Sequence, residues 1–163
     1  MATLTVRNPR VVSGHLATTR MLILNGQSWK KGELLNVDAS GLLNECASDD
    51  YATSTGGIKF LALNDQANPG NSTTTVEVGV LTRDIVLEGN ELDGTVSNAN
   101  VGQQYGIDVT SNVLTIDTAE TTAAAIEVVD VASNYAPENN STSDVSGRLK
   151  FKILTTSLEA APA

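Results

Sequence analysis

Few residues in this chain are of the types that perform catalysis. His15 is its only histidine and Cys46 its only cysteine. A Ser-His-Asp triad would have to use His15; Ser13 would share a strand face with it, which does not ensure hydrogen-bond reach. A nucleophilic cysteine needs a base nearby, and no histidine lies in the segment around Cys46. We therefore expect a protein that is not an enzyme, with no catalytic residue and no cofactor.

The acidic residues could serve two other kinds of site. Glycoside hydrolysis uses paired carboxylates in a cleft, and a sugar cleft usually has aromatic walls, whereas aromatic residues make up only 4% of this chain. Calcium prefers oxygen ligands, which residues 49–50, 88–93 and 138–140 could supply. None of these segments matches a defined calcium-loop pattern. We expect solvated loops there and no metal site.

Composition narrows the class of protein further. A net charge of −9 argues against sequence-independent binding of nucleic acid, which needs clustered basic residues. Apolar runs such as residues 21–24 are too short to span a bilayer, and residues 1–10 lack the apolar region of a secretion signal. We expect no membrane partner and synthesis in a cytoplasm-like compartment. With 40% hydrophobic but few aromatic residues, the core must consist mainly of aliphatic side chains.

Basic residues are concentrated at the two ends of the sequence. Residues 1–32 contain five basic residues and no acidic one, whereas residues 33–147 contain only Lys59 and Arg83 as basic residues. Such polarity could orient docking on a partner, or the basic ends could neutralise the acidic body within the same chain. Trp29 could likewise be an interface anchor or fill the core. The candidate contact residues are Arg7, Arg10, Arg20, Trp29, Lys30, Lys31, Arg148, Lys150 and Lys152.

The hydrophobic pattern predicts short strands separated by turns. Residues 75–80 and 147–154 alternate most clearly between apolar and polar positions, and residues 104–109 and 113–117 form the best hairpin candidate. The other predicted strands are 20–24, 33–37, 58–63, 84–88 and 125–131. Only residues 119–125 could be helical, and two threonines weaken that prediction.

Closely spaced strands of this kind are typical of a sandwich or a barrel. We expect an all-β protein: a single compact β-barrel or β-sandwich, β-tulip-like or jelly-roll-like. The predicted organisation is an extended N-terminal arm at residues 1–19, a β-rich domain at 20–155 and a flexible tail at 156–163. Deleting residues 1–19 should then leave a folded domain.

Four segments, taken in their order along the chain, resemble the decoration or cement proteins of tailed bacteriophages. They are Asn25-Gly26-Gln27-Ser28-Trp29-Lys30-Lys31-Gly32-Glu33-Leu34, Ile58-Lys59-Phe60-Leu61-Ala62-Leu63-Asn64-Asp65, Val101-Gly102-Gln103-Gln104-Tyr105-Gly106-Ile107 and Gly147-Arg148-Leu149-Lys150-Phe151-Lys152-Ile153-Leu154. The resemblance lies in a polar, lysine- and glycine-containing entry to a strand, a hairpin that starts at a Val-Gly step, and a final strand with alternating basic residues. It covers scattered pieces of residues 20–155.

The resemblance implies a head-stabilising protein on the outer surface of the capsid. Such proteins are made in the host bacterial cytoplasm and bind the major capsid protein, commonly as homotrimers. The arm at residues 1–19 would contact the capsid by strand addition and charge pairing.

Two other classes remain open from the sequence. A tail-tube or head–tail joining subunit would also be small and β-rich, although tube proteins usually carry a helix packed on the sheet. A carbohydrate- or receptor-binding β-module would need an aromatic-lined or calcium-bearing groove, for which the sequence supplies little.

Overall fold

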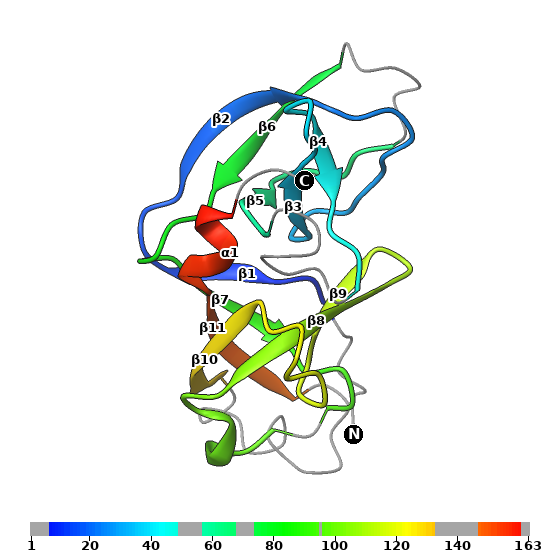
Figure 1. Ribbon diagram of the computed structural model, residues 1–163. Coiled ribbons are helices and arrows are strands. Elements are labelled where there is room, and N and C mark those ends of the chain that lie inside the picture. The colour runs from blue at the N-terminus through cyan, green and yellow to red at the C-terminus, as the bar shows by residue number, and fades with distance from the viewer. Residues whose placement is uncertain (1–6, 49–56, 68–73, 95, 133–146, 161–163) are drawn as a thin grey trace.

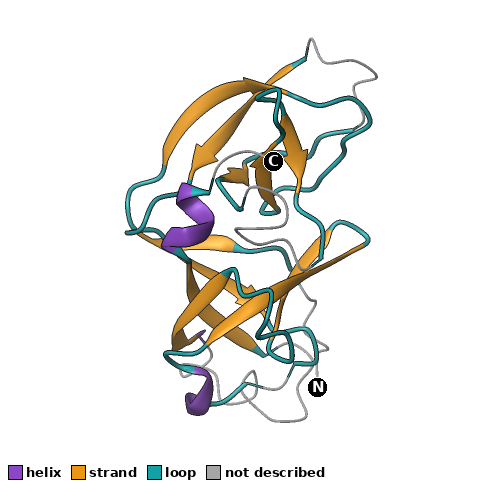
Figure 2. Cartoon of the chain, in the orientation of Figure 1, coloured by secondary structure: helices purple, strands orange, loops and turns teal. Residues whose placement is uncertain are grey.

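Two antiparallel β-sheets are the main elements of the computed structural model (Figures 1 and 2). The structure describes residues 7–48, 57–67, 74–94, 96–132 and 147–160. The strands are β1 (Arg10–Ser13), β2 (Ala17–Leu22), β3 (Leu34–Val37), β4 (Leu43–Glu45), β5 (Phe60–Ala62), β6 (Thr75–Val80), β7 (Val86–Asn90), β8 (Gln104–Thr110), β9 (Val113–Asp117), β10 (Ile126–Val131) and β11 (Arg148–Ile153). A 3₁₀ turn at Asn98–Asn100 and the short helix α1 (Thr155–Glu159) complete the described elements. The prediction of an all-β fold is confirmed.

The five-stranded sheet has the order β2-β6-β5-β3-β4, and the six-stranded sheet the order β1-β7-β11-β10-β8-β9. The clearest sequence patterns lie in the best-paired strands. In β11, Leu149, Phe151 and Ile153 are buried, while the alternating basic side chains face the other side of the sheet. That alternation follows from the two-residue period of a strand. The predicted hairpin is also present: β8 and β9 pair from Gly106 opposite Asp117 to Thr110 opposite Val113.

Each sheet curls so that strands that are not neighbours in its order approach one another. A single parallel bridge joins Ile23, just beyond β2, to Leu43 in β4. A second bridge joins Glu91, just beyond β7, to Ile116 in β9. Both contacts are isolated bridges rather than ladders, so neither sheet closes into a barrel within the described residues. Two antiparallel sheets over a shared core are consistent with a β-sandwich.

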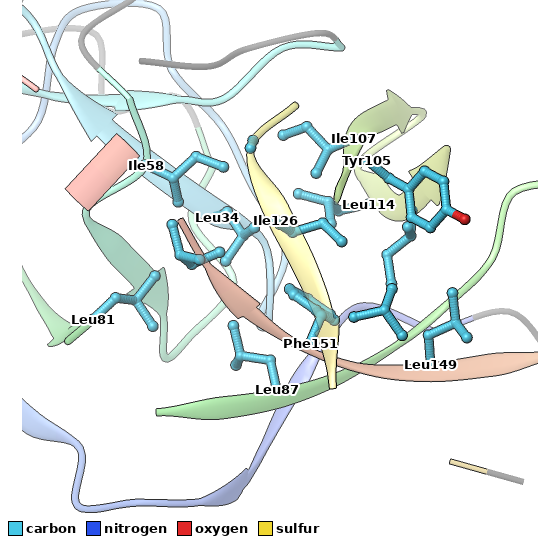
Figure 3. Packing of buried hydrophobic residues seen from close by; sticks show 14 of the residues in the cluster. Leu34, Ile58, Leu81, Leu87, Tyr105, Ile107, Leu114, Ile126, Leu149 and Phe151 are labelled. Carbon is cyan, nitrogen blue, oxygen red and sulfur yellow. The ribbon is translucent and has the colours of Figure 1, made fainter. Parts of the chain in front are cut away.

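The main hydrophobic core contains residues from both sheets. Leu34, Ile58 and Leu81 belong to the five-stranded half, and they meet the β7, β10 and β11 side chains of the six-stranded half (Figure 3). Phe151 is the largest fully buried side chain in this cluster. A second, smaller cluster lies within the five-stranded half around Trp29, Leu35 and Leu43. Because the main core is shared, the two sheets support each other.

The N-terminal segment differs from the predicted arm. Residues 7–19 are largely extended, as expected, but they belong to the domain: β1 pairs with β7, and β2 pairs with β6. Leu16, between these strands, packs against the main core. The predicted boundary at residue 19 therefore falls inside β2.

The C-terminal segment also differs from the predicted tail. Residues 155–159 form α1, and Ser157 within it is fully buried. Lys59 Nζ donates a 2.9 Å hydrogen bond to the Leu158 carbonyl, and Leu154 N–H donates to the Ala125 carbonyl at the same distance. These contacts hold the end of the described chain against both halves of the domain. The possible helix at residues 119–125 is not formed; residues 119–124 are turns and irregular chain.

Candidate interaction surface

One continuous segment supplies an edge strand to each of the two sheets. β1 lies at the edge of the six-stranded sheet, and β2, four residues further on, lies at the edge of the five-stranded sheet (Figure 1). We call residues 10–22 the N-terminal edge. In the described part of the chain, no strand ladder forms on the outer side of β1 or of β2; β4 contacts only the end of β2, through the Ile23–Leu43 bridge.

The backbone groups that β2 presents outward can be identified from its neighbours. Ile23 N–H bonds to the Thr74 carbonyl on the β6 side, whereas Leu24 N–H bonds to the Leu43 carbonyl on the opposite side. Because backbone groups alternate along a strand, odd-numbered residues of β2 bond to β6 and even-numbered residues face away from it. The N–H and C=O groups of Thr18 and Arg20 therefore lie along the open edge and could pair with an incoming strand, whereas β4 approaches the end of β2 at the Ile23–Leu43 bridge.

The side chains of the N-terminal edge combine apolar and basic groups. Val12 and Leu22 are 38% and 40% exposed, and they are two of only four exposed large hydrophobic residues in the described ranges. Arg10 and Arg20 are exposed on the same segment. The segment contains no acidic residue in a chain of net charge −9. It therefore offers open backbone groups, apolar contact and the positive charge of Arg20.

The loop between β1 and β2 is fixed to the body of the domain. Gly14 has a φ of +95°, and a Cβ there would lie 2.7 Å from the Asp84 carbonyl oxygen. The carboxyl of Asp84 accepts hydrogen bonds from the Thr82 hydroxyl, from its own backbone N–H and from the backbone N–H of His15, and these bonds, that from Thr82 most of all, hold its pKa below the usual value. Because the loop is fixed, β1 and β2 keep a defined relation to each other.

Several predicted basic contacts are instead neutralised within the chain. Arg10 and Arg148 both pair with Glu88 Oε1, at 3.3 and 2.6 Å, and Lys150 pairs with Asp130 at 3.8 Å. The strand register places Arg10, Glu88, Lys150 and Asp130 in one row across β1, β7, β11 and β10. Opposite charges at facing positions stabilise a sheet modestly. This row matches the alternative in which the basic ends neutralise the acidic body.

The remaining predicted contact residues lie in three different places. Trp29 is 2% exposed and sits in the smaller core cluster, so core packing is the alternative that the structure shows. Lys30 and Lys31 are exposed beside Asp65: Lys30 Nζ lies 3.5 Å from it, and Lys31 N–H donates to it at 2.9 Å. These contacts lower the pKa of Asp65, the backbone hydrogen bond from Lys31 contributing most. Arg7 is exposed next to β1, where its N–H donates to Asn90 Oδ1.

The nine predicted residues therefore do not form one surface. Arg7, Arg10 and Arg20 lie on or next to the N-terminal edge; Lys152 and the other two basic residues of β11 lie on the outer face of the six-stranded sheet. The sequence did not reveal that β2 is an open edge, because edge position depends on which strands pair. The alternating exposure of β2 was visible only as the pattern Thr-Thr-Arg-Met-Leu.

The structure also locates the residues that the sequence offered for catalysis or metal binding. Cys46 is buried in the main core, and His15 is exposed in the loop between β1 and β2. In the described ranges, no group of three or more His, Cys, Asp or Glu side chains is arranged to hold a metal ion. Of the candidate calcium segments, residues 49–50 and 138–140 lie outside the described residues. No helix among the described residues is long and apolar enough to cross a membrane.

Comparison with known proteins identifies no relative of this chain: no protein-family model, no curated protein and no solved structure matches it.

Proposed function

We propose that this chain is a structural protein of a tailed-bacteriophage virion, which binds the outer surface of the capsid and stabilises contacts between major capsid protein subunits. The observation that carries the proposal is the open, basic N-terminal edge, whose strand β2 presents unpaired backbone groups. The ordered resemblance of four sequence segments to decoration proteins supplies the identity of the partner.

Binding takes place by strand addition in this proposal. An extended segment of the major capsid protein pairs with the outward backbone groups of Thr18 and Arg20. Backbone hydrogen bonds supply part of the affinity, and Val12 and Leu22 lose exposed apolar surface on binding. Arg20 selects an acidic capsid segment through charge complementarity. Three copies around a three-fold position would clamp neighbouring capsid subunits.

The decisive test uses expanded capsids that lack decoration protein, from the virus that encodes the chain. Thr18→Pro removes one outward N–H, and proline is tolerated on an edge strand because that N–H does not serve the sheet. Thr18→Val changes the same exposed side chain but keeps the N–H. In co-sedimentation, the wild type and Thr18→Val should bind saturably, and Thr18→Pro should bind at least ~10-fold more weakly.

Folding of both variants is checked by the thermal unfolding midpoint. If Thr18→Pro is folded and binds as tightly as Thr18→Val, strand addition at β2 is wrong. If the wild type does not bind these capsids at all, the decoration function is wrong.

A further inference from the structure

A buried carboxyl group lies where the two halves of the domain meet. Glu33 immediately precedes β3 and is 1% exposed. Its Oε2 accepts a 2.5 Å hydrogen bond from the backbone N–H of Lys30. Its Oε1 is buried and, with both carboxyls ionised, accepts no hydrogen bond from a donor among the described residues. A buried ionised carboxylate with an unpaired oxygen is costly, and such a group usually takes up a proton.

A second carboxyl group faces the first. β3 and β4 are antiparallel, and their register pairs Leu35 with Glu45. Glu33 lies two residues before Leu35 and so on the same face, at the diagonal position that long side chains can span. The carboxyl of Glu45 raises the pKa of Glu33 both as a hydrogen-bonding neighbour and by its charge.

The pair lies at a junction of three chain segments. Asn112, at the tip of the β8–β9 hairpin with a φ of +61°, acts on the Glu33 carboxyl and donates to the Ser28 carbonyl at 3.2 Å. Asn8 donates to the Asn112 carbonyl at 3.0 Å and accepts from Leu114 N–H at 2.7 Å. The hairpin of the six-stranded sheet, the N-terminal segment and the turn before β3 therefore meet around Glu33.

Burial is the largest influence on this group and raises the pKa of Glu33 to about 7 from its ordinary 4.5. Glu45 acts in the same direction; the backbone hydrogen bond from Lys30 and the contact with Asn112 act against it. The two lysine ammonium groups on the adjoining segments bind other partners and do not pair with the Glu33 carboxyl. The Lys30 ammonium lies 3.5 Å from Asp65, and the Lys59 ammonium donates to the Leu158 carbonyl.

We propose that Glu33 and Glu45 form a carboxyl–carboxylate pair that holds one proton, and that loss of this proton weakens the junction between the two sheets. A proton fits better than a metal cation, because the backbone N–H of Lys30 points a hydrogen-bond donor at the Glu33 carboxyl. Cation sites need several further oxygen ligands. When both carboxyls are ionised, the buried negative charge of Glu33 lies close to that of the half-buried Glu45.

The sign of the pH effect follows from linkage. Because the folded state raises the pKa of Glu33, it binds this proton more tightly than the unfolded chain. The stabilisation is fully present below pH 4.5, the ordinary value, and is lost as the pH rises through about 7. The protein should therefore become less stable between weakly acidic and weakly alkaline conditions.

The test compares thermal unfolding of the full chain at about pH 5.5 and pH 8.5. The wild-type midpoint should fall by roughly 3–8 °C because of this pair. Glu33→Gln, which keeps the shape of the protonated carboxyl, should lose most of that fall and unfold at a higher temperature than the wild type at the alkaline pH. Glu77→Gln removes the same charge from an exposed position on β6 and should follow the wild type.

Two results would overturn the proposal. One is a wild-type midpoint with the same pH dependence as that of Glu33→Gln. The other is a wild-type midpoint at alkaline pH that rises with calcium chloride and falls with a chelator, which would make the pair a cation site. If Glu33→Gln fails to fold, side-chain carbon NMR of the wild type decides: the Glu33 carboxyl must titrate near neutral pH rather than near 4.5.

Discussion

The guanidinium of Arg148 lies 2.6 Å from Glu88 Oε1, and this ion pair is largely removed from solvent. The two side chains are 20% and 10% exposed, respectively. Arg10 approaches the same oxygen from the other side at 3.3 Å, but its side chain is 67% exposed. Glu88 thus joins β1 to β11 through β7, and two of the candidate partner contacts are used within the chain.

These two arginines should differ in their effect on stability. Removing one partner of a buried pair leaves an uncompensated charge, whereas exposed pairs contribute little. Arg148→Met should lower the free energy of unfolding by about 2 kcal/mol, and Arg10→Met by less than ~1 kcal/mol. Urea unfolding of both variants measures the difference. Equal losses of unfolding free energy would show that solvent exposure does not determine how much each ion pair contributes to stability.

Charge on the N-terminal edge should matter for capsid binding. Arg20→Glu reverses an exposed charge beside the open backbone of β2, and it should weaken binding by at least ~10-fold, more so at low salt. Arg83→Glu is the matched control, because Arg83 is 74% exposed and lies outside the N-terminal edge. Titration of capsids with each variant gives the affinities. Similar losses from both would indicate an effect of net charge alone.

Deleting residues 1–19 should abolish cooperative folding. The deletion removes β1, half of β2 and Leu16, which packs against the main core. The sequence had suggested a folded domain without this segment, so the experiment separates an arm from an integral strand. Circular dichroism during heating shows whether the truncated protein unfolds cooperatively. A sharp unfolding transition would instead support the prediction that residues 1–19 are a separate arm.

The contact between Gly57 and α1 should be intolerant of a side chain. Gly57 has a φ of +75°, and a Cβ there would lie 2.0 Å from the Ser157 carbonyl oxygen. Gly26 has a similar φ of +80° but open space around it. Gly26→Ala should cost about 1 kcal/mol from backbone strain, and Gly57→Ala at least ~2 kcal/mol more, because α1 must move. Thermal unfolding compares the two variants.

Strand positions could be predicted well where hydrophobic residues alternate. The predicted strand at residues 75–80 is β6, and the predicted strands at 33–37 and 125–131 differ from β3 and β10 by one residue at the start. The prediction missed β4, because Leu43 is its only buried large residue and Asn44 and Glu45 resemble a loop. It also missed β1, because strand pairing rather than side-chain pattern places Arg10–Ser13 in a sheet.

The proton-binding pair could not be found from sequence for a similar reason. Glu33 and Glu45 are 12 residues apart in the sequence. Glu33 precedes one predicted strand, and Glu45 lies in a segment that resembles a loop, so nothing in the sequence connects them. Only the β3–β4 register brings them together, and Glu33 is buried where the β8–β9 hairpin meets the turn before β3. The apolar neighbours Leu34 and Leu35 were a weak sign that the preceding glutamate would be buried.

The capsid-binding function is tested most directly by co-sedimentation of the purified protein with expanded, undecorated capsids. We predict saturable binding with a fixed number of copies per shell, retained by Thr18→Val and lost by Thr18→Pro. Absence of the wild-type protein from the capsid pellet, with rings or tubes formed by the protein alone, would contradict the account and indicate a tail or connector subunit.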